Sequence, residues 1–528
     1  MSEAWLNEIQ QQFAATGIET VEHHPARLLP ARQLEIAPHA WVPATALCRQ
    51  CAMRWAAFWV RETGSGLEAF SCLEKGGGYL ILSTRLGEQQ PLESIAHLYP
   101  AADRPQRHAH DLFGIAFEGQ CDSRRWTRHQ AWREDDFPLR GDGQTTKPPA
   151  PTPAPTPADD SYPFVQASGS AVYEIAVGPV HAGIIEPGHF RFQAVGETVI
   201  NLEKHLGYVH KGIEKLARGR DLDGLARLAG RVSGDSTVAH SWAACQAAER
   251  VLGVEPPPRA QLLRAIMAER ERVANHLGDI GAICNDVGFA FPHYQLSRLK
   301  ERLVRDNALL FGHRLMMDRI VPGGVAIDID SQGADHMFAC TQELESEVAR
   351  LIEIIERSES LEDRLMTTGR LTPEWAAELG CLGYVGRASG CDFDVRRDAP
   401  YAPYHRVEVA VPGYRAGDVA ARAKIRADEI GISLGLMRRF VELLEPGEHR
   451  LPMPQGRGGE GLGIVDGWRG EIISYLALDA DGRVERFFPR DPSWLNWPAL
   501  EQLIQGNIVP DFPVCNKSIN GSYSGQDL

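Results

Sequence analysis

A proline-rich segment divides the chain and limits what can fold on either side of it. Residues 145–157 read TTKPPAPTPAPTP. Because proline fixes φ and has no backbone N–H, the segment can form neither a helix nor a central strand, so we expect an extended polyproline-II spacer. The 528 residues exceed one ordinary domain. The sequence therefore predicts an α+β domain at 1–143, a linker at 144–159 and a larger domain at 160–528.

Composition restricts the class of protein. Hydrophobic residues make up 43% and charged residues 24% of the chain, as in ordinary globular domains, and no run of about 18 apolar residues marks a membrane span. The net charge of −15 argues against a nucleic-acid surface. The acidic N-terminus lacks the basic, then apolar, pattern of a signal peptide, which predicts residence in the cytoplasm.

Ten cysteines in a cytoplasmic chain are expected to be free thiols. Cys48 and Cys51 form the one close pair. Together with Cys72 and a histidine they could form a zinc site, but no second pair follows, which favours structural burial.

After the linker, apolar residues recur at intervals of three and four, which predicts a bundle of long helices. The helical windows are 196–218, 237–252, 259–283, 294–318, 333–367 and 415–444. Alternating patterns at 173–177 and 469–478 predict strands near the two ends of this domain, and the apolar run 78–83 predicts a strand before the linker.

Two segments resemble the metal-ligand motifs of NiFe-hydrogenase large subunits. Residues 231–240 (RVSGDSTVAH) resemble R-x-C-G-x-C-x-x-x-H, and residues 518–525 (SINGSYSG) resemble S-I-D-P-C-L-S-C. The four cysteine positions are occupied by Ser233, Ser236, Ser522 and Gly525. A nickel–iron centre needs soft thiolate donors, which hydroxyls and glycine cannot replace. The resemblance therefore implies a hydrogenase-type scaffold without its metal site.

Other segments extend this resemblance along most of the chain. Residues 178–192 (GPVHAGIIEPGHFRF) are similar to the family's first strand–loop motif, and residues 209–216 (VHKGIEKL) to its H-R-G-I-E-K-L helix. Residues 111–119 (DLFGIAFEG) resemble a signature of the smaller of two neighbouring hydrophilic subunits of respiratory complex I. The fused order, small part first, resembles the formate hydrogenlyase and hydrogenase-4 component G type of large subunit.

The resemblance points to four candidate catalytic residues. Glu186 stands where the hydrogenase family places a proton-transfer carboxylate, whose pKa burial would raise. His181 lies where complex I has its quinone-site histidine. His240 ends the first motif, and Arg469 matches an arginine that reaches over the hydrogenase active site. Each also has a structural interpretation, as a loop cap, a packed histidine or an ion pair.

Four polar residues share one face of the predicted helix 259–283. At spacings of three and four they are Glu269, Arg272, His276 and Asp279. A solvated or interface face is the favoured interpretation, and coupling of the former metal pocket to a membrane arm is the alternative. Asp235, between the two serines, either contributes to a water-filled proton path or marks neutral decay of the pocket.

No cofactor is predicted to bind to this chain, because it has no G-x-G-x-x-G after a strand, no Walker loop and no closely spaced cysteines for an iron–sulfur cluster. NAD binding is implied only by the resemblance to the complex I family. The resemblance implies other partners: a small iron–sulfur subunit, antiporter-like membrane subunits, and a formate dehydrogenase or ferredoxin-like subunit.

The function implied is that of an oxidoreductase subunit held at the cytoplasmic face of the membrane by its complex. It would pass electrons from a partner's iron–sulfur cluster to a quinone-type acceptor with proton coupling. The alternative is a non-catalytic subunit that couples the iron–sulfur partner to an ion-translocating arm. Hydrogenase activity itself is not expected.

Overall fold

The structure, a computed structural model, describes residues 4–24, 27–129, 136–141, 162–183 and 185–528. The predicted linker at 144–159 lies outside these residues. Its polyproline conformation and the two domain boundaries that it defines therefore stay predictions.

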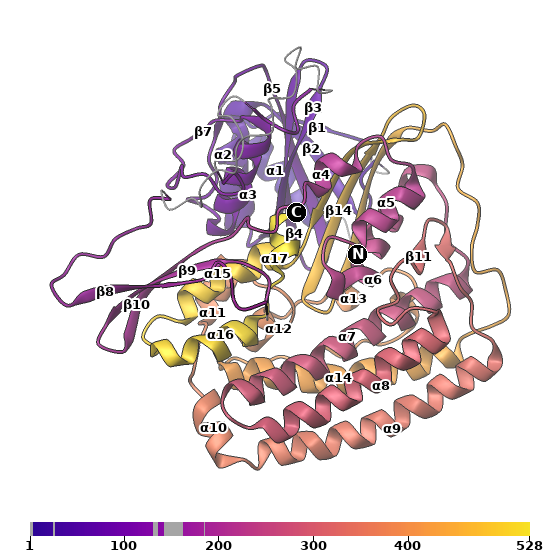
Figure 1. Ribbon diagram of the computed structural model, residues 1–528. Coiled ribbons are helices and arrows are strands. Elements are labelled where there is room, and N and C mark those ends of the chain that lie inside the picture. The colour runs from indigo at the N-terminus through magenta and orange to yellow at the C-terminus, as the bar shows by residue number, and fades with distance from the viewer. Residues whose placement is uncertain (1–3, 25–26, 130–135, 142–161, 184) are drawn as a thin grey trace, which may run out of the picture.

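A five-stranded mixed sheet forms the N-terminal part (Figure 1). In spatial order its strands are β1 (Thr20–Glu22), β2 (Ala31–Ile36), β5 (Gly78–Leu86), β4 (Gly66–Lys75) and β3 (Arg54–Thr63). Neighbours are antiparallel except β2 and β5, which are parallel. The strand predicted at 78–83 lies within β5. One face of the sheet packs on α1 (Ala4–Ala15), α2 (Trp41–Gln50) and α3 (Asp103–Phe113). A short parallel pair, β6 (Leu92–Glu93) and β7 (Phe117–Glu118), flanks them.

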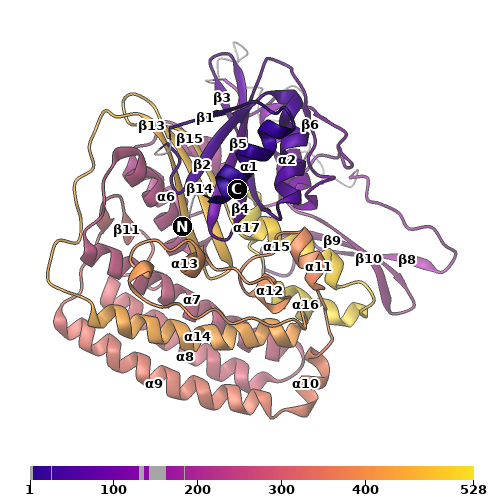
Figure 2. The ribbon, with the colours of Figure 1, turned by 180° about the vertical axis from the view of Figure 1, so that it is seen from behind.

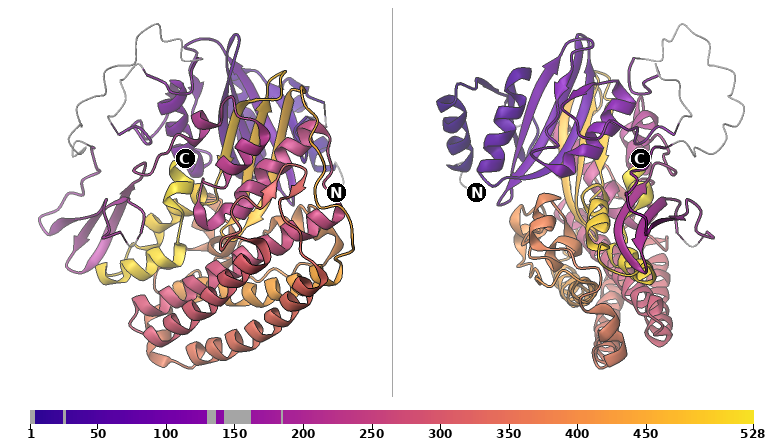
Figure 3. Two further views of the ribbon diagram at one scale, coloured as in Figure 1. Left: turned by 45° about the vertical axis from the view of Figure 1, so that its right-hand side comes forward. Right: turned by 90° about the vertical axis from the view of Figure 1, so that its left-hand side faces the viewer.

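The other face of this sheet packs on a second sheet from the C-terminal part. Its antiparallel strands are β13 (Gly459–Gly467), β14 (Gly470–Leu478) and β15 (Val484–Arg490). Trp59 of β3 lies between the sheets, with its ring centroid 5.2 Å from that of Tyr475 and 6.0 Å from that of Phe488. Side chains of a strand alternate between its two faces, and β3 presents apolar side chains both to the helices and to the second sheet. The indigo and gold sheets lie against each other in Figure 3, so the two parts share one core.

Behind the second sheet lies α6 (Thr237–Leu252), and the approach is close. A Cβ on Gly461 would lie 2.3 Å from the carbonyl oxygen of Ala247, and one on Gly463 would lie 1.8 Å from that of Ala243. No side chain fits at such separations, so glycine at these two positions allows the helix to rest directly on β13.

Long helices form the lower layer, as predicted (Figures 1 and 2). They are α7 (Pro258–Asp286), α8 (Ala290–Phe311), α9 (Ser331–Glu356) and α14 (Val419–Glu442). The central helix α7 packs on both α8 and α14, while α9 runs along the outer edge of the bundle. The remaining helices of this part are shorter. They are α4 (Ile213–Ala217), α5 (Leu222–Ala229), α10 (Glu359–Leu365), α11 (Pro373–Glu378), α12 (Gly383–Ala388), α13 (Val395–Asp398), α15 (Ser493–Leu503), α16 (Phe512–Ile519) and α17 (Tyr523–Asp527). A two-residue strand pair, β11 (Ile320–Val321) and β12 (Gly324–Val325), follows α8.

The helix predicted at 196–218 is wrong over most of its length, and only α4 at its end is helical. Strand β10 (Thr198–His205) occupies its first half and pairs with β9 (His189–Val195), which also pairs with β8 (Val172–Val177). The β-branched run at 198–200 favours a strand, and pairing with β9 satisfies its backbone, which outweighs the helical spacing of its apolar residues. The strand predicted at 173–177 is confirmed by β8, and the three strands form a ribbon that extends from the body (Figure 1).

The mixed helix and sheet class is confirmed. Within the described residues, no helix is both long enough and apolar enough to cross a bilayer.

Candidate functional site

The two motif segments meet in the interior although they lie far apart in the sequence. Ser233 precedes the turn that leads into α6, and Ser522 caps α17 by accepting a hydrogen bond of 2.9 Å from the backbone N–H of Gly525. The hydroxyl oxygens of Ser233 and Ser522 are 2.8 Å apart, and both side chains are buried. Two of the four positions where the resembling motifs have cysteine are therefore in direct contact.

The position of Gly525 has no room for a side chain. A Cβ there would lie 2.6 Å from Cγ and 2.7 Å from Oδ2 of Asp491, well inside the roughly 3.5 Å of an ordinary carbon contact. The carboxylate of Asp491 is fully buried, and its Oδ2 lies 2.8 Å from Nε2 of His240. Burial acts to raise the pKa of Asp491, but the hydrogen bond and charge of His240 outweigh it and lower this pKa. Asp491 thus occupies the space that a fourth ligand would need.

An ion pair extends from the buried part of the pocket to its surface edge. Arg469 donates to both carboxylate oxygens of Asp235, at 2.8 and 2.6 Å, and its Nε donates to the carbonyl oxygen of Asn520 at 2.7 Å. It also lies 3.2 Å from the hydroxyl of Ser236. Burial alone would raise the pKa of Asp235, but the guanidinium and the serine hydroxyls lower it to about 2. This bidentate pair is the strong form of carboxylate–arginine contact.

The strand–loop motif lies at the surface beside this pocket. His181 is half-buried, and its Nε2 lies 2.8 Å from the carbonyl oxygen of Gly188 in the same loop. Glu186 is exposed, so the burial expected for it is wrong. Its carboxylate accepts a hydrogen bond of 3.1 Å from the backbone N–H of Ser524, at the N-terminus of α17. A carboxylate is favourable there because the helix dipole is positive at that end.

The stripe on α7 is buried, so its interpretation as a solvated or interface face is wrong. Glu269 accepts hydrogen bonds from Arg396, from the hydroxyl of Tyr404 at 2.5 Å and from the hydroxyl of Ser433 at 2.6 Å. Burial raises its pKa, but the charges of Arg396 and Arg272 lower it to about 2. The sequence pattern could not reveal this, because the partners come from segments more than 120 residues away.

The far end of the stripe reaches the second motif. His276 lies 2.6 Å from Glu429 of α14, and Asp279 pairs with Arg426 of the same helix at 3.1 Å. Asp279 also accepts a hydrogen bond of 2.8 Å from the side chain of Asn520. Buried, paired charges therefore lie along this face of α7 from Glu269 to Asp279, which contacts the second motif.

Sequence reasoning missed Asp491 and Asn520, which contact His240 and Arg469. The only local signal for Asp491 is its place in Asp-Pro-Ser at the start of α15, where its Oδ1 accepts a hydrogen bond from the backbone N–H of Ser493. Such a signal indicates a helix start and gives no information about a partner on another helix.

Of the cysteine pair of the N-terminal part, Cys48 lies on α2 and Cys51 directly follows this helix. Cys48 is fully buried, and the thiol of Cys51 donates to Oε1 of Gln12 at 3.0 Å. Cys72 is buried in β4. These contacts agree with the structural interpretation.

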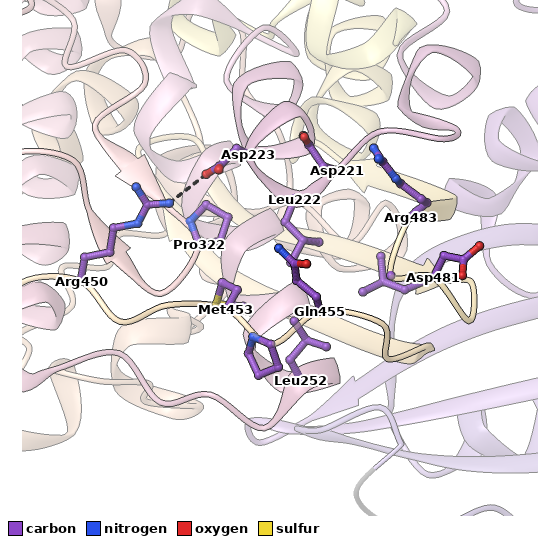
Figure 4. A pocket seen from close by; sticks show the side chains of 13 residues that line it. Asp221, Leu222, Asp223, Leu252, Pro322, Arg450, Met453, Gln455, Asp481 and Arg483 are labelled. Carbon is purple, nitrogen blue, oxygen red and sulfur yellow. Dashed lines mark hydrogen bonds and ion pairs between the residues drawn. The ribbon is translucent and has the colours of Figure 1, made fainter.

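A surface cavity of about 420 Å³ lies elsewhere, between α5, β11 and the β14–β15 turn (Figure 4). Asp223 and Arg450 form an ion pair of 3.0 Å in its wall. None of the four candidate catalytic residues and none of the four former cysteine positions lines this cavity.

Comparison with known proteins gives three family matches in chain order. The family described as respiratory-chain NADH dehydrogenase, 30 Kd subunit matches residues 34–149, nickel-dependent hydrogenase matches 211–278, and respiratory-chain NADH dehydrogenase, 49 Kd subunit matches 286–457. Formate hydrogenlyase subunit 5 of Escherichia coli is 30% identical over 82% of this chain and 76% of its own length. The chain belongs to the family of complex I-like and NiFe-hydrogenase-related large subunits.

Two further relatives support the assignment, and one solved structure shares the fold. Carbon monoxide-induced hydrogenase of Rhodospirillum rubrum is 33% identical over 67% of this chain and 99% of its own length, and hydrogenase-4 component G of Escherichia coli is 31% identical over 83% and 76%. A chain of the membrane-bound sulfane sulfur reductase, an archaeal respiratory membrane complex, shares the fold with a TM-score of 0.64 at 24% identity, over 68% of this chain and 99% of its own. The resemblance expected from the motifs is confirmed.

Proposed function

We propose that this family member is the large hydrophilic subunit of a membrane-associated oxidoreductase and works without a nickel–iron centre. It lies on the cytoplasmic face of the membrane, bound through partner subunits. A partner's iron–sulfur cluster supplies two electrons, and a quinone-type acceptor takes them up with two protons to give the quinol.

We infer the absence of a nickel–iron centre because side chains fill the pocket in which the metals would lie. The hydroxyls of Ser233 and Ser522 are hydrogen-bonded to each other, and the Arg469 guanidinium lies beside them, paired with Asp235. Hydroxyl oxygens are poor ligands for soft metals. The carboxylate of Asp491 fills the space beside Gly525. These residues do not fit a nickel–iron centre, and no step of the proposed function passes through one.

The acceptor is assigned to the surface edge of this pocket. His181 is partly exposed, Glu186 is exposed, and 40% of the Asp235 side chain reaches solvent. A partner subunit docked over this edge would exclude water and leave an imidazole and a carboxylate beside the acceptor. An imidazole can protonate a quinone oxygen near neutral pH, and a neighbouring carboxylate can relay a proton to replace the one transferred.

Quinone reduction by the whole complex tests this assignment. The double variant His181→Ala with Glu186→Gln is expected to lose quinone-analogue reduction while its assembly is unchanged. A matched control, His405→Ala with Glu408→Gln, makes the same two substitutions at exposed positions elsewhere and should keep the wild-type rate. Equal rates in both double variants would remove the assigned roles.

The second candidate is a structural subunit that couples the iron–sulfur partner to an ion-translocating arm. It is favoured by the full pairing of Arg469, whose three nitrogens all donate to Asp235 or Asn520. If this candidate holds, substitutions in the pocket matter less than substitutions on the loop that carries His181 and Glu186. Variants of that loop then reduce assembly of the complex rather than its turnover. Elemental analysis of the purified complex for nickel tests both candidates, since each requires its absence from this chain.

A further inference from the structure

Three metal-binding side chains converge on the outer face of the helix bundle, on a part of the fold that the proposed function does not use. Asp306 projects from α8, and His336 and Cys340 project from α9. The two residues of α9 are four positions apart, which places them one above the other on one face of the helix. Among the described residues, this is the one group of three His, Cys, Asp or Glu side chains whose donor atoms lie together.

The distances suit a single ion. Nε2 of His336 lies 2.5 Å from Oδ1 of Asp306, and the thiol of Cys340 lies 3.5 Å from the same nitrogen. All three donor atoms are within 4.8 Å of one another. Bonds of about 2.0 Å to nitrogen and oxygen and 2.3 Å to sulfur in a tetrahedral site place ligand atoms roughly 3.3–3.5 Å apart. The His336 side chain, 43% exposed, has room for the outward movement of about 1 Å that an ion requires.

A buried arginine orients the carboxylate of Asp306. The second oxygen of Asp306 pairs with Arg270, a fully buried arginine of α7 that also contacts Asn307. A ligand that is oriented by a buried partner is typical of metal sites, where such partners fix the geometry of the coordinating group. The arginine leaves Oδ1 facing His336 and Cys340.

We propose that Asp306, His336 and Cys340 bind one divalent ion of borderline softness, best matched by zinc, that joins α8 to α9. One nitrogen, one sulfur and one oxygen donor leave the fourth tetrahedral position to water. Thiolate and imidazole disfavour magnesium and calcium, which take oxygen ligands. The ion adds a cross-link between the outermost helix of the bundle and its neighbour, beside the ion pairs of Arg298 and Arg302 with Glu347.

Titration of the full-length chain with Co²⁺ tests the site, because cobalt in a thiolate site gives a ligand-to-metal charge-transfer band. The wild type is expected to bind one Co²⁺ with this band, and an equivalent of Zn²⁺ should remove it while Mg²⁺ in excess does not. Cys340→Ser should abolish the band, and His336→Ala should weaken Co²⁺ binding at least tenfold. Cys121→Ser, which removes an exposed cysteine elsewhere, should leave binding unchanged.

The outcomes separate clearly. A band of wild-type strength in Cys340→Ser, or Co²⁺ affinity unchanged in His336→Ala, overturns the proposal, as does a wild type without the band. Both substitutions lie at the surface of α9, and an unchanged circular dichroism spectrum confirms that the variants fold. The result does not depend on the redox role, since metal binding is measured on the isolated chain without electron donor or acceptor.

Discussion

Replacing Gly525 by alanine should loosen the C-terminal helix α17 through a collision with Asp491. The new methyl group would lie 2.6 Å from Cγ of Asp491, and overpacking of this kind costs about 1–3 kcal/mol. Displacing the carboxylate also weakens its bond to His240, and a hydrogen bond to a charged group contributes about 1.5–3 kcal/mol. The better helix propensity of alanine offsets about 1 kcal/mol. The net cost is therefore at least about 1.5 kcal/mol.

Hydrogen exchange of the amides at 520–528 measures this local opening directly. Since about 1.4 kcal/mol corresponds to a factor of ten, exchange in Gly525→Ala should be at least roughly tenfold faster than in the wild type. Gly431→Ala in α14 is the matched control, because a Cβ there meets nothing within 4 Å. It should leave α17 unchanged and protect its own helix slightly. Protection of α17 equal to or above that of the wild type would refute the steric reasoning, and with it the view that the fourth ligand position is filled.

Two further predictions concern buried carboxylates. Burial raises the pKa of Asp527 from 3.8 to about 7, so between these values the folded state binds the extra proton and stability falls as pH rises. In Asp527→Asn, the backbone amides at 520–528 should therefore exchange more slowly than in the wild type at pH 8 and equally fast at about pH 4. Identical pH profiles of exchange in the two proteins would contradict this. Glu269→Ala leaves the buried guanidinium of Arg396 without one of its two carboxylate partners and should cost about 3–5 kcal/mol, seen as a lower melting midpoint. Glu301→Ala, which removes exposed ion pairs, should shift that midpoint little.

Much of the fold could be predicted because its signals are local. The long helices α7, α8 and α14 follow from apolar spacing over many turns, which reports directly on one buried face. The same rule failed at β10, where spacing in a short segment fits either element and pairing with β9 decides. Which segments become neighbours is a property of the whole chain, and a local pattern does not contain it.

The site was predicted in outline and not in its contacts. Resemblance of the two motifs indicated that Ser233 and Ser522 belong to one pocket, and their hydroxyls do meet. The exposure of Glu186 and the buried pairing of Glu269 could not be predicted, because both depend on side chains from distant segments. Charged residues at helical spacing look the same whether water or arginine lies opposite, so only three-dimensional packing distinguishes the two.

The core shared by the N-terminal sheet and the β13–β15 sheet has a consequence for how the protein is made. Trp59 and Phe70 cover Tyr475 with their rings, and either part alone would present this aromatic surface to water. Covalent continuity between residues 141 and 162 makes the docking of the two sheets intramolecular, so it does not depend on the cellular level of a separate subunit. Translation as one chain therefore produces the N-terminal and C-terminal parts in equal amounts.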